Sequence, residues 1–198
     1  MAENGKKLIC IGTSTGGPRA LENLLPRFPK TLNVPILIVQ HMPPTFTKSL
    51  ANRLDRLAAL RVKEAEDGED IRSDTAYIAP GNFHMTVRRN RTGLSIQLDQ
   101  NAPYKGHRPS VNNLFQSVSH IQDYQIIAVV LTGMGTDGTA GLKVLKSMKN
   151  DVTAIAESEK TCIVFGMPRS AIQANVIDEI APIDRMADTI LKHLNCGG

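Results

Sequence analysis

The sequence is poor in aromatic side chains and in cysteine. It has no tryptophan, aromatic residues make up 4% of its 198 residues, and there are three cysteines. Proteins that bind single-stranded nucleic acid stack bases on aromatic side chains, so we expect no nucleic-acid partner. Cys10, Cys162 and Cys196 are too few and too scattered for a disulfide framework or a zinc site. We therefore expect a reduced, cytoplasmic protein with no metal and no cofactor.

Long apolar runs are also missing. No stretch approaches the roughly 20 apolar residues of a membrane span, and no apolar segment long enough for a signal peptide follows the start of the chain. We expect no insertion into a membrane. The composition, 41% hydrophobic and 21% charged, is typical of a globular protein. The net charge of +4 fits either simple solubility or an acidic partner.

Short apolar segments alternate with amphipathic ones. Buried strands are predicted at 8–11, 36–39, 126–131 and 152–156. Helices whose apolar stripes face the core are predicted within 21–28, 46–57, 111–118, 142–148 and 186–194. Alternation in 84–89 and 94–99 predicts an antiparallel hairpin. These patterns predict one α/β domain over residues 1–198, a three-layer, doubly wound and mainly parallel sheet with an added β-hairpin.

Three predicted strands are followed by a hydroxyl, an imidazole and a carboxylate. Ser14 lies in GTSTG, which fits G-x-S-x-G, and His41 and Asp137 follow the strands at 36–39 and 126–131. Each has a structural reading: Ser14 or Asp137 can cap a helix, and His41 can be a structural histidine. Because all three fall at the edge where open α/β sheets place their sites, together they favour a Ser-His-Asp hydrolase.

A second interpretation of the glycine-rich segment 12–17 is a phosphate- or nucleotide-binding loop at a helix start. The sequence gives it less support. There is no Walker lysine, and the Rossmann pattern fails because position 14 is serine. The usual α/β-hydrolase assignment is also weak, because those enzymes order the triad Ser, acid, His.

Seven motifs in register resemble the catalytic domain of the chemotaxis protein-glutamate methylesterase family, CheB. They are IGTSTGGP, QHMPPTFTKSLANRL, VKEAEDGE, YIAPGNFHM, HRPSV, LTGMGTDG and FGMPRSAI. The resemblance runs in order from about residue 6 to residue 194. It implies a parallel, doubly wound sheet with a hairpin, which agrees with the pattern above.

The resemblance also implies an activity and roles for residues. The activity is serine-dependent hydrolysis of γ-glutamyl methyl esters on the cytoplasmic helices of chemotaxis receptors, with deamidation of receptor glutamines in some members. By motif, Ser14 is the nucleophile, His41 the general base and Asp137 its orienting partner. The backbone at Met134 and Gly135 falls at the oxyanion pocket. Thr15, His107 and Arg108 are weaker candidates for substrate binding, and for Arg108 a surface ion pair is favoured over a contact with a substrate carboxylate.

Family members usually carry an N-terminal receiver domain, and few residues precede the first predicted strand here. We therefore expect either an excised catalytic domain or a member without that control. Asn112 stands where an acid is usual and Thr136 where asparagine is common, and we expect neither to touch the triad. A third hypothesis is a receptor-docking domain without catalysis.

Overall fold

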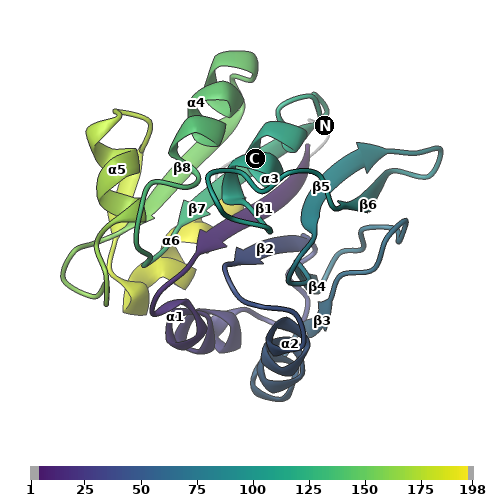
Figure 1. Cartoon of the computed structure of the whole chain (residues 1–198), viewed down its shortest axis with the longest axis horizontal. Helices are drawn as coiled ribbons and strands as arrows, with labels where there is room; N and C mark the ends of the chain where they lie inside the picture. The colour runs from purple at the N-terminus through teal and green to yellow at the C-terminus, as the bar shows by residue number, and fades with distance from the viewer. Residues whose placement is uncertain (1–4, 196–198) are drawn as a thin grey trace.

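The computed structural model describes residues 5–195, which form a seven-stranded sheet and a separate two-stranded sheet (Figure 1). The order of the large sheet is β3-β4-β2-β1-β7-β8-β9, and every neighbouring pair is parallel. Its strands are β1 (Lys6–Thr13), β2 (Ile36–Gln40), β3 (Arg61–Glu64), β4 (Thr75–Ile78), β7 (Tyr124–Val130), β8 (Val152–Glu157) and β9 (Glu179–Ala181). The hairpin consists of β5 (His84–Arg89) and β6 (Leu94–Asp99), paired antiparallel.

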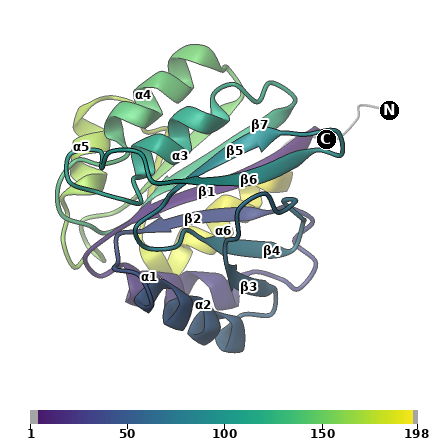
Figure 2. The same ribbon diagram turned by 45° about the vertical axis from the view of Figure 1, so that its right-hand side comes forward.

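Helices cover both faces of the large sheet (Figures 1 and 2). One face carries α1 (Gly17–Leu24) with the short 3-10 turn Leu25–Arg27, α2 (Phe46–Leu57) and α6 (Ile183–Asn195). The other carries α3 (Val111–Val118), α4 (Thr139–Met148), α5 (Met167–Gln173) and the hairpin. The predicted three-layer α/β fold is therefore confirmed.

The central strands are buried on both faces, which explains their continuous apolar sequence. In β1, Ile9 and Ile11 belong to the core on the side of α1, while Leu8 and Cys10 belong to the core on the side of α3. All four are fully buried. No helix within residues 5–195 is both long enough and apolar enough to cross a bilayer.

The stripe predicted for 46–57 is only partly correct. Phe46 and Leu57 are 63% and 51% exposed, so they do not face the core. The side chains of α2 that are buried are those of Thr47, Leu50, Ala51 and Leu54. The predicted stripe begins at Phe46, whereas the buried one begins at Thr47, and both continue through Leu50 and Leu54. The shift leaves an aromatic ring in solvent where α2 begins.

The sheet places β1 between β2 and β7, so three loops meet at its carboxyl edge. Thr13 at the end of β1 is in register with Gln40 at the end of β2, and Gly12 is in register with Val130. The next residues along the three strands lead directly into the segments with Ser14, His41 and Asp137.

Candidate active site

Ser14 and His41 lie side by side at the ends of two neighbouring strands. They follow the registered pair Thr13 and Gln40, and neighbouring strands are about 4.8 Å apart. The His41 N–H donates to Thr13 O at 3.2 Å, which extends the strand pairing by one step. The buried Gln40 amide donates to Ser14 O and to His41 O, both at 3.0 Å. One side chain therefore fixes the backbone of both residues.

Gln40 fits there because residue 17 is a glycine. A Cβ at Gly17 would lie 1.9 Å from Gln40 Oε1 and 2.5 Å from Thr13 Oγ1. The close approach lets α1 begin directly over the end of β1. Gly17 is thus needed for the hydrogen bonds that Gln40 makes to Ser14 and His41. This need is separate from any role of Gly17 in exposing the serine.

His41 is bound to Asp137. His41 Nε2 and Asp137 Oδ2 are 2.7 Å apart, and the two side chains are 9% and 2% exposed. His41 Nδ1 is buried and has no hydrogen-bond partner among the described residues. With Nε2 held by the carboxylate, Nδ1 is the ring nitrogen left to exchange a proton with a neighbouring group.

The Asp137 carboxylate lies against the N-terminus of α3. Its Oδ1 accepts from Ser110 Oγ at 2.9 Å and from the Asn112 N–H at 3.0 Å, and its Oδ2 also accepts from the Val111 N–H at 2.7 Å. Burial raises the pKa of Asp137, but the hydrogen bonds from His41 and from these backbone N–H groups outweigh it, and the net pKa lies below the ordinary value. The helix dipole also favours the anion.

The expectation that the departure at Asn112 leaves the triad untouched is wrong. The Asn112 N–H donates to Asp137, and its side-chain Oδ1 accepts from the Gly138 and Gly141 N–H groups at 3.0 and 2.6 Å. Asn112 therefore joins α3 to the start of α4 around the carboxylate. A backbone contact of this kind leaves no signal in residue identity. Thr136 is exposed beside this network.

The loop with Ser14 is also held from the side of β7. The Ser14 N–H donates to Thr132 O at 3.0 Å, and Thr132 Oγ1 donates to Thr15 O at 2.9 Å. A Cβ at Gly133 would lie 2.9 Å from Ser14 Cβ and 2.4 Å from Met167 Sδ. Only glycine fits at 133 without displacing the serine.

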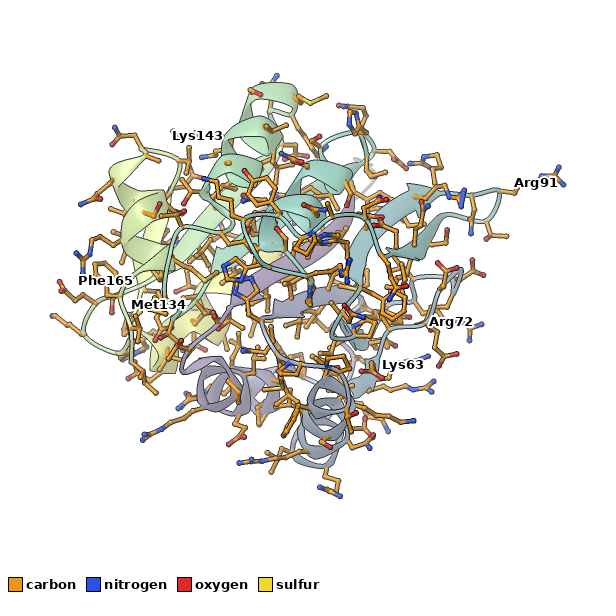
Figure 3. The ribbon with its side chains drawn as sticks, viewed as in Figure 1. Lys63, Arg72, Arg91, Met134, Lys143 and Phe165 are labelled. Carbon is orange, nitrogen blue, oxygen red and sulfur yellow. The ribbon has the colours of Figure 1, made fainter. Side chains whose placement is uncertain are left out.

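Met134 and Gly135, the predicted oxyanion residues, follow directly. Met134 is 69% exposed, and its N–H donates to none of the described residues. Gly135 has φ +87°, in the left-handed region that favours glycine. In Figure 3 the labelled Met134 and Phe165 lie near each other on the loops after β7 and β8, and a bridge between Gly133 and Phe165 joins these loops.

The weaker candidates take three different positions. The ring of His107 stacks on His41 with centroids 4.0 Å apart and planes at 7°. Arg108 donates to Asn82 Oδ1 and to two carbonyls of the 100–101 segment, which ties down its own loop. Thr15 is exposed next to Ser14. A cleft of about 330 Å³ opens between His41, Asn82 and the 106–109 loop.

The pKa of His107 is lowered by burial first and by the neighbouring His41 second, while the Asp137 carboxylate acts in the opposite direction. The neutral ring is therefore the favoured form in the stack. Within residues 5–195, no three His, Cys, Asp or Glu side chains are grouped so that they can hold a metal ion.

Several residues of the site escaped the sequence analysis. They are Gln40, Ser110, Thr132 and Glu157, all buried. Three of them are neighbours of predicted residues or lie in the quoted motifs, but nothing in their identity indicates long-range bonds. The one available signal is position, because each of the four lies at or just beyond a strand end or next to a helix start.

Comparison with known proteins identifies the family. The family model for CheB methylesterase matches residues 9–190. Two curated relatives, from Halalkalibacterium halodurans and Geobacillus kaustophilus, are 53% and 55% identical over 187 and 185 residues. Both are named protein-glutamate methylesterase/protein-glutamine glutaminase. The alignments cover 94% and 93% of this chain but 54% and 53% of the relatives, so the chain spans about half of their length.

A solved structure agrees. The crystal structure of the Thermotoga maritima CheB methylesterase catalytic domain is 43% identical in sequence and superimposes with a TM-score of 0.90. The match covers 94% of this chain and 98% of that one. On sequence and on fold, the chain belongs to the CheB methylesterase family.

Proposed function

We propose that this chain is a catalytic domain, over residues 1–198, that hydrolyses γ-glutamyl methyl esters and, as a second reaction, deamidates glutamine side chains of chemotaxis receptors. The observation that carries the proposal is the imidazole of His41, bound through Nε2 to a buried carboxylate and free at Nδ1, beside Ser14. The names of the relatives supply the ester and the amide as substrates.

The chemistry follows from these groups. Ser14 Oγ attacks the ester carbonyl carbon while its proton moves to His41 Nδ1, and Asp137 stabilises the imidazolium. The backbone N–H of Met134 is free to donate to the oxyanion that forms. The C–O bond to the methoxy group then breaks, and methanol leaves with the proton from His41.

Water completes the cycle through the same base. It attacks the acyl-enzyme carbonyl and gives a proton to His41, and Ser14 leaves with that proton as glutamate is released. With a glutamine substrate the first leaving group is ammonia. Apart from the substrate, the reaction consumes only water, and no atom changes its oxidation state. It therefore needs no redox partner.

The charge around the site supports an acidic partner. The loops after β1, β2, β7 and β8, the loop that leads into α3 and the first turns of the helices after them carry basic residues. These are Arg19, Lys48, Lys105, Arg108, Lys143, Lys160 and Arg169. Of the acids on the same segments, Asp137 and Glu157 are buried and Glu159 is exposed. A basic rim raises the encounter rate with an acidic receptor helix.

Two further parts of the proposal rest on the family resemblance. The receptor's cytoplasmic helices are the partner, which places the protein in the cytoplasm. A receiver domain is a second partner, as a part of full-length members. The chain matches about half the length of its relatives, which is consistent with this division.

The alternative, phosphate binding by the 12–17 segment, has less support. The Gly17 N–H donates to Ser14 O at 2.8 Å and the Ser14 N–H donates to Thr132 O. Two of the N–H groups that would cradle a phosphate are therefore used within the protein.

The test is methanol release from a methylated receptor fragment, with wild type, Ser14→Ala and Ser49→Ala side by side. Ser49 is an exposed serine of α2 and serves as the matched control. We expect Ser49→Ala to release methanol at the wild-type rate and Ser14→Ala to lose about 10³-fold or more. Unchanged release from Ser14→Ala contradicts the mechanism. Receptor binding without release by the wild type supports a docking domain instead, and micromolar binding of FMN, ATP or NAD without release supports the phosphate loop.

A further inference from the structure

A second buried carboxylate lies behind the proposed nucleophile. Glu157, the last residue of β8, is 1% exposed. Its Oε2 accepts from the Thr132 N–H at 2.8 Å, and its Oε1 accepts from Thr161 Oγ1 at 2.9 Å. The mechanism above does not use it.

The Glu157 carboxylate serves as the hydrogen-bond acceptor just beyond the point where the pairing of β7 with β8 ends. The last registered pair of these strands is Val130 with Ala156. Beyond it, the Thr132 N–H has no strand carbonyl to bond, and a buried N–H without an acceptor is costly. The carboxylate supplies that acceptor, and a charged acceptor makes a stronger bond than a carbonyl.

Thr132 carries this contact to the loop with Ser14. Its carbonyl accepts from the Ser14 N–H at 3.0 Å and from Thr13 Oγ1 at 2.9 Å, and its hydroxyl donates to Thr15 O at 2.9 Å. Three consecutive residues, with the serine in the middle, therefore bond to Thr132. A shift of Thr132 moves all three.

The other oxygen of Glu157 fixes the far wall of the site. Thr161 Oγ1, which donates to Glu157, also accepts from the Ile183 N–H at 3.0 Å where α6 begins. In the same loop, Val164 O accepts from the Gly133 N–H at 3.0 Å, and Gly133 precedes Met134. The carboxylate thus touches both segments that set the position of the Met134 N–H.

We propose that Glu157 is a positioning residue that holds Ser14 Oγ and the Met134 N–H in register with His41 by accepting the Thr132 N–H. The inference rests on the proposed function and extends it to a residue outside the triad. We expect the catalytic rate to depend on Glu157, because a displacement of a catalytic group by about 1 Å costs on the order of 100-fold in rate.

A substitution at Glu157 leaves a space and does not overpack the core. The carboxylate lies at the wall of a cavity of about 270 Å³ that also contacts Gly16, Thr132 and Thr161. Water can therefore enter where the side chain is shortened, and the polar groups around it can hold that water. We expect the chain to fold after Glu157→Ala.

The test compares Glu157→Gln, Glu157→Ala and Asp178→Ala. In Glu157→Gln the amide oxygen accepts the Thr132 N–H and the amide nitrogen donates to Thr161 Oγ1, so kcat stays within about 3-fold of wild type. Glu157→Ala removes the acceptor, and kcat falls about 10- to 100-fold while KM stays within about 3-fold. Asp178 is the matched control, because it accepts the Ala154 N–H on the same strand at 2.7 Å but lies at the opposite end. Asp178→Ala keeps the wild-type kcat.

A second readout is the rate at which a fluorophosphonate modifies the active-site serine, which does not depend on receptor docking. It follows the same order as kcat, measured where thermal melting shows every variant folded. If Glu157→Ala does not fold, Glu157→Asp replaces it, with the carboxylate drawn back by one methylene and an expected loss of about 10-fold.

The inference is overturned if Glu157→Ala keeps full kcat, if Asp178→Ala loses as much as Glu157→Ala, or if Glu157→Gln loses as much as Glu157→Ala. An active Ser14→Ala overturns the proposed function itself. An inactive Ser14→Ala together with a fully active Glu157→Ala overturns this inference alone.

Discussion

At the carboxyl edge of the sheet, buried hydroxyl groups donate to oxygen atoms far along the chain, whereas at the amino edge buried hydroxyl groups donate to carbonyls of close neighbours. Thr13 bonds to Thr132, 119 positions away, at the carboxyl edge. At the amino edge, Ser119 bonds to a carbonyl three residues before it, and Thr75 to one two residues before it. Local bonds stabilise a turn, while long-range bonds hold separate loops at fixed distances from each other.

The charges of the two edges differ in the same way. At the amino edge, Asp178 pairs with Lys146 at 2.6 Å and Glu179 pairs with His193 at 2.7 Å. Around the proposed site, basic side chains gather with one exposed acid, Glu159, among them. These two acids of the amino edge are therefore paired within the protein, whereas the segments around the proposed site present positive charge. The proposed site therefore has both of its requirements, fixed geometry and an attractive field, at one edge.

The largest expected effect comes from breaking a long-range bond at the carboxyl edge. Asp137→Asn keeps the shape of the side chain but places an amide where His41 and three backbone N–H groups donate. We expect kcat to fall about 10³- to 10⁴-fold, as for the equivalent change in a Ser-His-Asp triad. Asp178→Asn at the amino edge stays within about 2-fold. Initial rates of methanol release measure both.

Asp137→Asn also changes how the stability of the protein depends on pH. The pKa of Asp137 is lowered in the folded protein, so its charged form stabilises the fold above the ordinary value of 3.8, and this contribution is lost as pH falls through the folded value. Asp137→Asn lacks that contribution, so its melting temperature is lower than that of wild type at neutral pH and the difference narrows in acid. An equal difference at all pH values contradicts this account.

The sequence allows prediction of those parts of the fold that follow from a regular pattern of apolar and polar residues. Strand runs such as Leu8–Ile11 are apolar without interruption because both faces of the sheet are covered, and this pattern predicts their burial. Alternation with helices then gives the parallel order, and the order places Ser14 and His41 at one edge. The contact between His41 and Asp137 was expected on that basis.

The sequence does not allow prediction of contacts made by backbone groups. Nor does it allow prediction of contacts made by a side chain whose role depends on the space around it. The N–H of Asn112 bonds to Asp137 whatever its side chain is, and Gln40 serves by filling the space that Gly17 leaves. Phe46 satisfies the helical spacing, yet its neighbour Thr47 faces the core. These contacts depend on how each helix and loop packs against the sheet, and this packing is set by the tertiary structure.

A smaller effect is expected from reversing the charge of one edge. The triple variant Arg19→Glu, Lys143→Glu, Lys160→Glu changes exposed side chains near the site, and Lys30→Glu, Arg61→Glu, Arg91→Glu changes exposed ones elsewhere. Arg91 lies at the tip of the hairpin, far from Met134 in Figure 3. Both variants change the net charge equally.

We expect the first triple variant to lose about 10-fold in kcat/KM on a receptor fragment at low salt, because it removes the attraction for an acidic helix, and the second to lose much less. Added salt reduces the difference, since it screens charges beyond about 10 Å. Equal losses in the two variants show that only net charge matters and remove the contrast between the edges.

The smallest effect concerns the two stacked rings at the carboxyl edge. Burial and the neighbouring His41 lower the pKa of His107, so the neutral imidazole is the favoured form of His107 beside His41. His107→Phe keeps a ring in the stack and removes a group whose charged form is disfavoured there. The acid limb of kcat/KM, measured from about pH 5 to 9, then coincides with that of wild type.

His107→Arg tests the same stack with a fixed charge. Guanidinium can stack on a ring, as the His107 ring does on His41 at 4.0 Å, and a positive charge in that stack disfavours a second one on His41. We expect the acid limb to move to lower pH and kcat to fall, because the imidazolium formed in the reaction is destabilised. His193→Phe, at the amino edge, leaves the profile unchanged. If His107→Phe moves the acid limb as well, His107 itself contributes a charge to that limb, which contradicts the neutral stack.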